Sequence, residues 1–98
     1  MAAYLIVTAQ IRDRARFLAD YAPAAAALTE RFGGEYLLRA PGAEVLEGDH
    51  PGGSVVVSRW PDKAAALAFW RSPEYAEAKR LREGVADCQV LVVEEPAA

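Results

Sequence analysis

An α+β fold is predicted by the order in which different sequence patterns follow one another. Apolar runs of strand length occupy 4–11, 54–60 and 88–94, and apolar residues recur at helical spacing between them. A shorter strand is expected after the first helix, before the turn-rich segment 48–53. The order strand, helix, strand, strand, helix, strand is the split βαβ, or ferredoxin-like, arrangement (βαββαβ). It places two helices on one face of an antiparallel sheet.

The first half of this arrangement begins with the strand at 4–11, which is apolar nearly throughout. Asp13 can then cap a helix, because its side chain can accept from the free N–H groups of a first turn. Pro23 lies inside this helix and removes a backbone donor, which predicts a kink or a break near 19–21. The apolar stripe of the helix recurs at intervals of four and seven: Phe17, Tyr21, Leu28 and Phe32.

The middle of the chain predicts a hairpin. A strand at 35–39 is interrupted at 40–42, and 44–47 is interpreted either as a continuation of its pairing or as a new strand. The turn cluster at 48–53 then leads into the returning strand at 54–60, whose centre is three consecutive valines.

The second helix is predicted in two segments. Asp62 caps a segment that reaches about residue 71, and the Ser-Pro pair at 72–73 restarts the helix, since proline suits a first helical position after a serine cap. The last strand follows at 88–94, and residues 95–98 are expected to form a loose tail.

Composition limits both the domain count and the class of partner. The chain of 98 residues is 53% hydrophobic, which predicts one domain over 1–98 with its core at about 4–94. A net charge of −3 with interleaved signs gives no basic stripe for nucleic acid. No apolar run approaches the roughly 20 residues that span a bilayer, so we expect no membrane partner and a cytoplasmic protein.

Apolar residues occupy both odd and even positions of the strands, as in 4–7, 55–57 and 90–93. An antiparallel sheet with one solvated face would alternate instead. We therefore expect the face without helices to be covered by a second copy of the chain, as in a dimeric α/β barrel.

Three short motifs carry a resemblance to a known family: LEGD at 46–49, RWP at 59–61 and RSPEY at 71–75. In this order they resemble the turn, strand exit and helix start of the domain-of-unknown-function 1330 family, and the resemblance runs from residue 4 to about 94. It implies the dimeric, ferredoxin-like α/β barrel and a basic residue near Arg82, and it implies no settled activity.

The chemistry available to the chain is narrow. Phosphate-binding loops, dinucleotide-binding glycine motifs and nucleophile elbows are all missing from the sequence. With one histidine and one cysteine, we predict neither a metal site nor a cofactor. Cys88 alternates with Val90 and Val92 along the last strand, which predicts a buried structural thiol.

Glu47 and His50 are the candidate catalytic residues. A glutamate held partly dry can act as a base, and histidine titrates near neutrality, so either side chain could abstract a proton. Arg39 or Arg59 could stabilise the resulting anion. The alternatives are a solvated loop histidine and a structural salt bridge between Glu47 and an arginine.

Candidate substrate-binding residues have either a large aromatic ring, which for Trp70 and Tyr75 lies beside the predicted helix break, or a guanidinium near the end of a strand or helix. Aromatic residues at helical spacing are more often core, and arginines near a helix C-terminus are explained by its dipole, so core packing is the alternative. The candidates are Tyr21, Arg39, Arg59, Trp60, Trp70, Tyr75 and Arg82.

Three functions follow as hypotheses. The first is a cytoplasmic homodimer, paired through the open sheet face, that binds a small organic molecule between sheet and helices. The second is a cofactor-free enzyme of the monooxygenase or isomerase type, which abstracts a proton from a small organic acid or aromatic compound. The third is a non-catalytic structural or stress-related interaction module.

Overall fold

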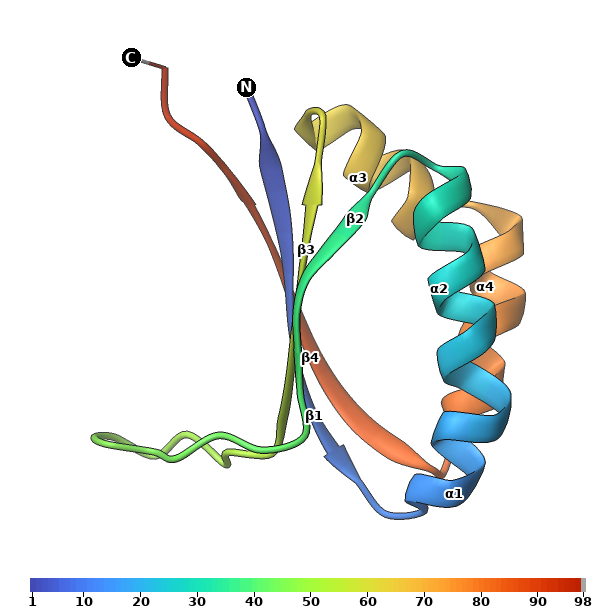
Figure 1. Cartoon of the computed structure of the whole chain (residues 1–98), viewed down its shortest axis with the longest axis vertical. Coiled ribbons are helices and arrows are strands. Elements are labelled where there is room, and N and C mark those ends of the chain that lie inside the picture. Colours follow the sequence, from blue (N-terminus) through green and yellow to red (C-terminus); the bar gives the residue numbers. More distant parts are fainter. Residues whose placement is uncertain (98) are drawn as a thin grey trace.

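The computed structural model describes residues 1–97, which form a four-stranded sheet with helices on one of its faces (Figure 1). Every strand pairing is antiparallel, and the strand order is β2-β3-β1-β4. The strands are β1 (Ala3–Ile11), β2 (Glu35–Ala40), β3 (Ser54–Trp60) and β4 (Ala86–Glu94). The predicted α+β, ferredoxin-like arrangement is confirmed.

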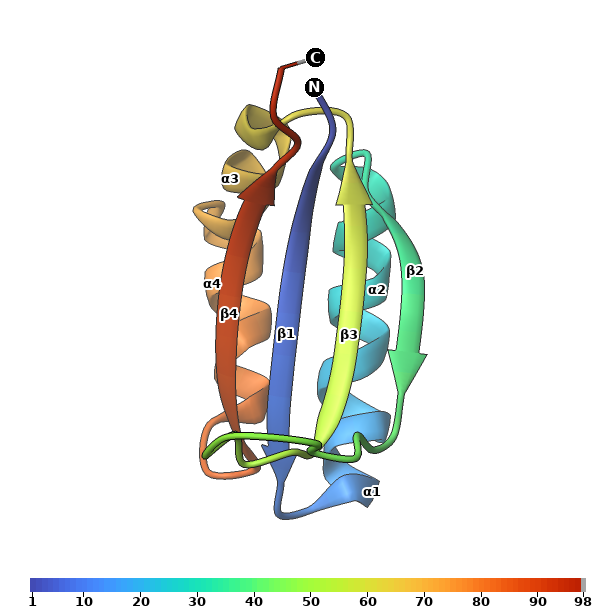
Figure 2. The ribbon, with the colours of Figure 1, turned by 90° about the vertical axis from the view of Figure 1, so that its left-hand side faces the viewer.

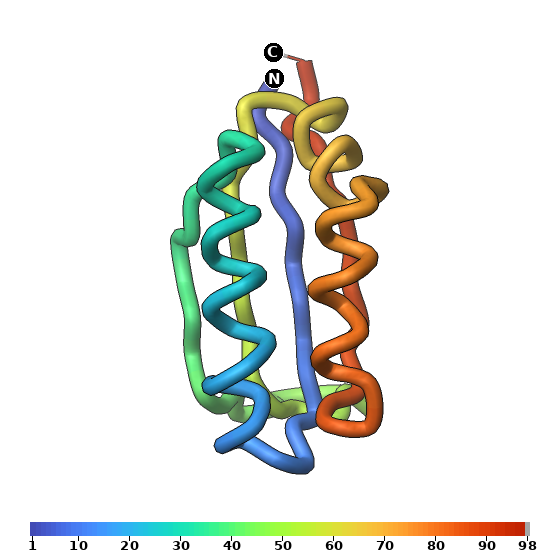
Figure 3. The backbone as a smooth tube through the Cα atoms, turned by 90° about the vertical axis from the view of Figure 1, so that its right-hand side faces the viewer, coloured from blue at the N-terminus to red at the C-terminus, as the bar shows by residue number. Residues whose placement is uncertain are grey.

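The helices form two rods that lie side by side over the sheet, with β1 visible between them (Figure 3). The first rod consists of α1 (Arg14–Arg16), the π-helical turn η1 (Phe17–Tyr21) and α2 (Ala22–Arg31). The second rod consists of α3 (Lys63–Trp70), α4 (Pro73–Lys79) and the 3-10 turn η2 (Arg80–Arg82). None of the helices within 1–97 is long and apolar enough to cross a membrane.

The first rod is irregular at 17–21, which includes the positions where a kink or a break was predicted. The helix does not break; the chain makes a π turn at η1, where the Ala22 N–H donates to the Phe17 carbonyl five residues earlier. Pro23 follows within the first two residues of α2. Because the proline has no N–H for the carbonyl four residues before it, a wider turn at this point keeps the helix continuous.

Residues 41–53, here called the arm, correct a second expectation. The predicted strand pairing at 44–47 is wrong, because the arm contains no strand. The ladder of β2 and β3 ends at the pair Ala40 and Val55, and β3 begins at Ser54, so no strand lies opposite 44–47. Figure 1 shows the arm projecting from the sheet on the side away from the helices, and Figure 2 shows it in front of one end of the sheet.

The base of the arm is anchored on both sides. The Ser54 hydroxyl donates to the Pro41 carbonyl over 3.1 Å. The Gln10 amide of β1 donates to the Gly52 carbonyl over 2.8 Å. These bonds join the two ends of the arm to the sheet and so fix the direction in which it leaves.

The hydrophobic core lies between the sheet and the second rod. Its buried members are Leu5, Trp60, Ala66, Phe69, Tyr75 and Ala78. The Phe69 ring centroid lies 4.9 Å from that of Trp60 and 4.5 Å from that of Tyr75. This aromatic stack fixes α3 and the start of α4 against β3.

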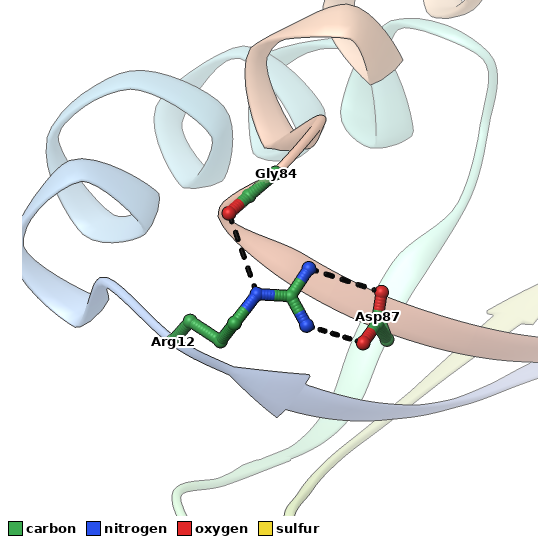
Figure 4. A network of polar contacts seen from close by, with 3 residues as sticks. All are labelled: Arg12, Gly84 and Asp87. Atoms are coloured by element: carbon green, nitrogen blue, oxygen red, sulfur yellow. Dashed lines mark hydrogen bonds and ion pairs between the residues drawn. The ribbon is translucent and has the colours of Figure 1, made fainter.

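A polar contact closes the sheet at the end of β1 (Figure 4). The Arg12 guanidinium donates to both carboxylate oxygens of Asp87, and its Nε donates to the Gly84 carbonyl over 3.4 Å. The hydrogen bond from Arg12 lowers the pKa of Asp87. The contact joins Arg12, the residue after β1, to the start of β4.

The chain end beyond β4 is held at its first residue. The Glu95 N–H donates to the Ala2 carbonyl over 2.8 Å, and its carboxylate accepts a hydrogen bond from the Tyr4 hydroxyl. Of the expected loose tail, residue 98 lies outside the described residues.

The sheet face opposite the helices, here called the open face, is turned toward the viewer in Figure 2. Leu5, Val7 and Ala9 face the helices, so alternation turns Ile6 and its paired neighbours to the open face. One row of paired apolar residues crosses all four strands in the order Leu38, Val57, Ile6 and Leu91. Leu91 is 62% exposed and Leu38 is 49% exposed, so this row is uncovered in a single chain.

Candidate functional site

A cavity of about 260 Å³ lies between the sheet and the first helical rod. Residues from every strand line it, and α4 and the end of α3 complete the wall. Its apolar walls include Leu5, Val7, Phe17, Ala25, Val56 and Val90. The cavity therefore offers an apolar body of space with a small number of polar groups at its boundary.

Tyr21 and Tyr75 form one polar group of the cavity. Their hydroxyl oxygens lie 2.7 Å apart, and either hydroxyl can be the donor. Burial, and next the neighbouring Tyr75, raise the pKa of Tyr21 far above its ordinary value, so this hydroxyl keeps its proton. Two hydroxyls that share one hydrogen bond leave one O–H hydrogen over, which is available to a molecule in the cavity.

Arg82 and Cys88 lie around this tyrosine pair. The Arg82 guanidinium carbon is 5.5 Å from the centre of the Tyr21 ring, in a cation–π arrangement. The Arg82 Nε is buried and has no hydrogen-bond partner within residues 1–97. Cys88 lines the cavity, and burial raises the pKa of its thiol, so it remains protonated at neutral pH.

The mouth of the cavity lies beside the base of the arm. The exposed lining residues are Arg14 of α1, Leu18 of η1, Arg39 of β2 and Pro41 of the arm. The Arg14 Nη2 donates to the Pro41 carbonyl over 3.3 Å and to the Ser54 hydroxyl over 3.2 Å. These two bonds hold the first helical rod against the arm.

Arg39 is positioned by a ring on its own strand. Its guanidinium carbon lies 4.5 Å from the centre of the Tyr36 ring. The Tyr36 hydroxyl in turn accepts a hydrogen bond from the Thr29 hydroxyl over 3.3 Å, which joins β2 to α2. A guanidinium stacked on a ring keeps its N–H edge free for an anion.

The cavity has a positive electrostatic character. Its described lining residues include Arg14 and Arg39 but no aspartate, glutamate or histidine. The mouth carries positive charge, the walls are apolar, and the two tyrosine hydroxyls bond to each other. These features favour binding of a small molecule over proton abstraction by a carboxylate or an imidazole.

Four predicted substrate-binding residues meet in this cavity: Tyr21, Arg39, Trp70 and Tyr75 all line it. Arg82 contacts the cavity through the Tyr21 ring. The aromatic rings of Trp70 and Tyr75 pack together with centroids 5.2 Å apart.

Arg59 and Trp60 lie apart from this group, beside a shallow hollow of about 490 Å³ near the turn between α2 and β2. Trp60 is 1% exposed, and its indole N–H donates to the Ser58 hydroxyl over 2.9 Å. Arg59 is exposed on β3, in register with Tyr4. Their binding roles stay predictions.

Glu47 and His50, the catalytic candidates, lie on the exposed arm and do not line the cavity. The His50 Nδ1 accepts a hydrogen bond from the Gly52 N–H over 2.9 Å, which is a local turn contact. The catalytic role of either residue stays a prediction.

Sequence reasoning did not single out Arg14, Tyr36 or Thr29. Arg14 follows a capping aspartate, where a solvent-exposed side chain is the ordinary expectation. Alternation gave no usable signal for Tyr36, because a register shift between Tyr36 and Leu38 interrupts the pairing of β2, and Tyr36 and Arg39, three residues apart, both line the cavity.

Comparison with known proteins places the chain in a family. The sequence profile of a domain of unknown function, DUF1330, matches residues 2–96. The chain belongs to the DUF1330 family. The resemblance inferred from three motifs is thus confirmed. A search of curated proteins found no match to the sequence of this DUF1330 chain.

Solved structures similar to this DUF1330 protein share its fold. A protein of unknown function from Rhodopseudomonas palustris, RPA0582, has a TM-score of 0.76 at 21% identity, with 99% of this chain and 84% of that chain covered. A dimeric ferredoxin-like protein of unknown function from Jannaschia sp. CCS1 has a TM-score of 0.76 at 15% identity, covering 97% and 100%. SnoaB from Streptomyces nogalater, a cofactor-independent oxygenase, has a TM-score of 0.68 at 14% identity, covering 99% and 95%.

Proposed function

We propose that this DUF1330 protein is a homodimer that binds a small organic molecule in the cavity of each subunit. The observation that carries the proposal is the convergence of Tyr21, Tyr75 and Arg39 on one apolar cavity. Apolar walls with a few placed polar groups are the usual construction of a small-molecule site.

The size of the cavity limits the molecule. Its volume of about 260 Å³ equals that of roughly nine waters in the liquid. This is slightly below the roughly 300–1,000 Å³ of sites for drug-sized ligands. A molecule with one or two rings, or a short chain, is the class that such a space supports.

The open face supports the second half of the proposal. An uncovered apolar row across a sheet needs a partner, and the Jannaschia protein of the same fold is described as dimeric. The arm extends on this same side of the sheet (Figure 1). Its residue Leu46 is 90% exposed. A second copy, packed face to face, covers both features by the same surface on each subunit.

An oxygenase or isomerase activity is the alternative, and SnoaB is its example among similar folds. At 14% identity that likeness extends to the fold alone. Proton abstraction also needs a base, and the described cavity lining includes no carboxylate and no imidazole. We therefore favour binding as the function of the cavity.

Native mass spectrometry of freshly purified protein tests both parts of the proposal. We expect the mass of two chains, with the additional mass of one small molecule per subunit, either retained or taken up from an added panel of organic acids and aromatic compounds. A monomer at micromolar concentration would contradict the dimer.

The matched control is Ala25→Leu, because Ala25 is 6% exposed and lines the cavity from α2. The larger side chain occupies part of the space. This variant should keep the dimer mass and lose the adduct. An adduct that survives unchanged in a folded Ala25→Leu protein would place the molecule elsewhere.

A further inference from the structure

We propose that the ligand of this cavity is an apolar carboxylic acid, whose carboxylate binds Arg39 and Arg14 at the mouth and whose body lies against the apolar walls. The inference rests on the proposed function and names the chemical class of the molecule. It is carried by the charges at the mouth, the composition of the walls and the position of the tyrosine pair.

The charges at the mouth are the first step. Within residues 1–97 the ion pairs join Arg12 to Asp87, Arg31 to Glu74 and Arg80 to Glu77, so neither arginine of the mouth is neutralised by a carboxylate. Two guanidinium groups on one small opening favour an anion, and a planar carboxylate matches the paired N–H groups of arginine.

The two arginines are also held in place before any ligand arrives. Arg39 is stacked on Tyr36, which Thr29 fixes by a hydrogen bond. Arg14 uses its Nη2 for Pro41 and Ser54, and its remaining N–H groups make no hydrogen bond to residues 1–97. Donors that are already oriented lose little side-chain entropy on binding.

The walls are the second step, because they exclude an anion that is hydrophilic throughout. The cavity is lined by side chains such as Val7, Val56 and Phe17, none of which can hydrogen bond. Burying hydroxyl groups of a sugar acid or the phosphate of a nucleotide against these walls would leave polar atoms unpaired. An aromatic or aliphatic body avoids that cost.

The tyrosine pair is the third step, because it sets a second polar point. Arg14 and Tyr21 lie on the same rod, separated by about two helical turns, or roughly 10 Å. Tyr75 reaches Tyr21 from α4. Arg39 lies on β2, and β2 and β4 are the two opposite edge strands of the sheet. A hydroxyl or keto oxygen at the far end of the acid can accept the spare O–H of the pair.

Binding of two matched pairs of compounds tests the charge. Isothermal titration calorimetry on the full chain compares 2-naphthoate with 2-naphthamide, and octanoate with octanamide. Each pair has one apolar body and differs in the negative charge. We expect the carboxylate of at least one pair to bind ten times more tightly than its amide, with a difference that shrinks as salt is raised.

Arginine variants locate the charge effect. Arg39→Gln and Arg14→Gln should each weaken binding of the carboxylate about tenfold and leave the amide within twofold. Arg16→Gln is the control, because Arg16 lies two residues from Arg14 on the same exposed turn and is not part of the cavity. It removes the same charge and should leave both affinities within twofold.

The outcomes separate this inference from the proposed function. Equal affinity for acid and amide would overturn the carboxylate class and leave a small-molecule site in place. A carboxylate preference that Arg16→Gln reduces as much as Arg39→Gln would overturn the assignment to the mouth. Failure of all four compounds to bind at millimolar concentration would overturn the apolar-acid class, while the adduct in native mass spectrometry still decides the proposed function.

The second polar point has its own comparison. In wild type, 6-hydroxy-2-naphthoate should bind about five times more tightly than 2-naphthoate. The double variant Tyr21→Phe/Tyr75→Phe, which removes both hydroxyls of the pair, should remove that difference. Circular dichroism checks that this variant is folded. An equal gain from the hydroxyl in wild type and in the double variant would show that the pair does not contact the far end of the ligand.

Discussion

The hydroxyl of Tyr21 lies 2.7 Å from the hydroxyl of Tyr75, and this hydrogen bond joins the two helical rods across the cavity. Tyr21 ends the π turn of the first rod, and Tyr75 is the third residue of α4, in the first turn after the Ser72 cap. The bond thus depends on two local irregularities, a widened turn and a restarted helix. Both aim an aromatic side chain into the layer between helices and sheet.

Tyr21→Phe should make the protein less sensitive to alkaline pH. Burial raises the pKa of Tyr21 above its ordinary 10.0, so the folded state holds this proton more tightly than the unfolded chain does. The stability from this difference is complete below pH 10 and is lost as pH rises further, by up to about 1.4 kcal/mol per pH unit. Urea unfolding at pH 8 to 11 measures the slope, which should be shallower in the variant.

Two effects in Tyr21→Phe are separable by pH. At pH 8 the loss of the hydrogen bond should cost about 1 kcal/mol. Between pH 10 and 11 the gap between variant and wild type should narrow. Parallel curves over the whole range would show that Tyr21 ionises in the folded protein as it does in the unfolded chain.

Gly34→Ala should destabilise the protein through Trp60. A Cβ at residue 34 would lie 2.7 Å from three atoms of the buried Trp60 ring, which is too close without a shift of the ring. Because Trp60 packs on Phe69, the shift would disturb the aromatic stack and cost about 1–3 kcal/mol. Thermal unfolding measures the change. Gly42→Ala is the control, since nothing lies within 4 Å of a Cβ there; a similar loss in both variants would exclude the clash as the cause.

The parts of the fold that were predictable from sequence are those set by local chemistry. Asp13, Asp62 and Ser72 each cap a helix as predicted, with side-chain oxygens that accept from N–H groups at 3.1, 2.7 and 3.0 Å. The strand at 44–47 failed because pairing is not local. Its residues suit a strand, but β3 begins at Ser54 and provides no neighbour.

The site was predictable where side-chain type and position agree. Tyr21 and Tyr75 were chosen as aromatic residues near predicted helix irregularities, and both line the cavity. Arg14 was not chosen, because no rule for the first turn of a helix indicates that a side chain crosses to the arm. Glu47 and His50 were chosen for their acid–base chemistry, which carries no information about the direction in which the arm leaves the sheet.

Cys88 should report occupancy of the cavity. It is the only cysteine of the chain, lines the cavity and has a thiol pKa raised by burial. Modification by a small maleimide should therefore be slow at pH 7 and faster as pH rises. A carboxylate ligand at saturating concentration should slow it at least fivefold, as measured by mass spectrometry over time.

The control for Cys88 protection is Arg39→Gln, in which the same ligand concentration should protect less because binding is weaker. Denatured protein should react at the rate of a free thiol. Protection that is equal in wild type and Arg39→Gln, at a ligand concentration near the wild-type dissociation constant, would mean that the compound does not use the mouth of the cavity.

Leu91→Asp should dissociate the proposed homodimer. Leu91 is 62% exposed at the end of the apolar row on the open face, and two copies of the variant would bury unpaired carboxylates against each other. We expect the dimer dissociation constant to rise roughly 100-fold, which sedimentation equilibrium measures. Leu46→Asp on the arm should raise the same dissociation constant about tenfold if each arm packs against the partner.

Leu81→Asp is the control, because Leu81 is 41% exposed on η2 in the helical layer, where no partner is proposed. A Leu91→Asp protein that remains as dimeric as Leu81→Asp would exclude the open face as the interface, and a loss of dimer in all three would point to unfolding, which circular dichroism of the same samples detects.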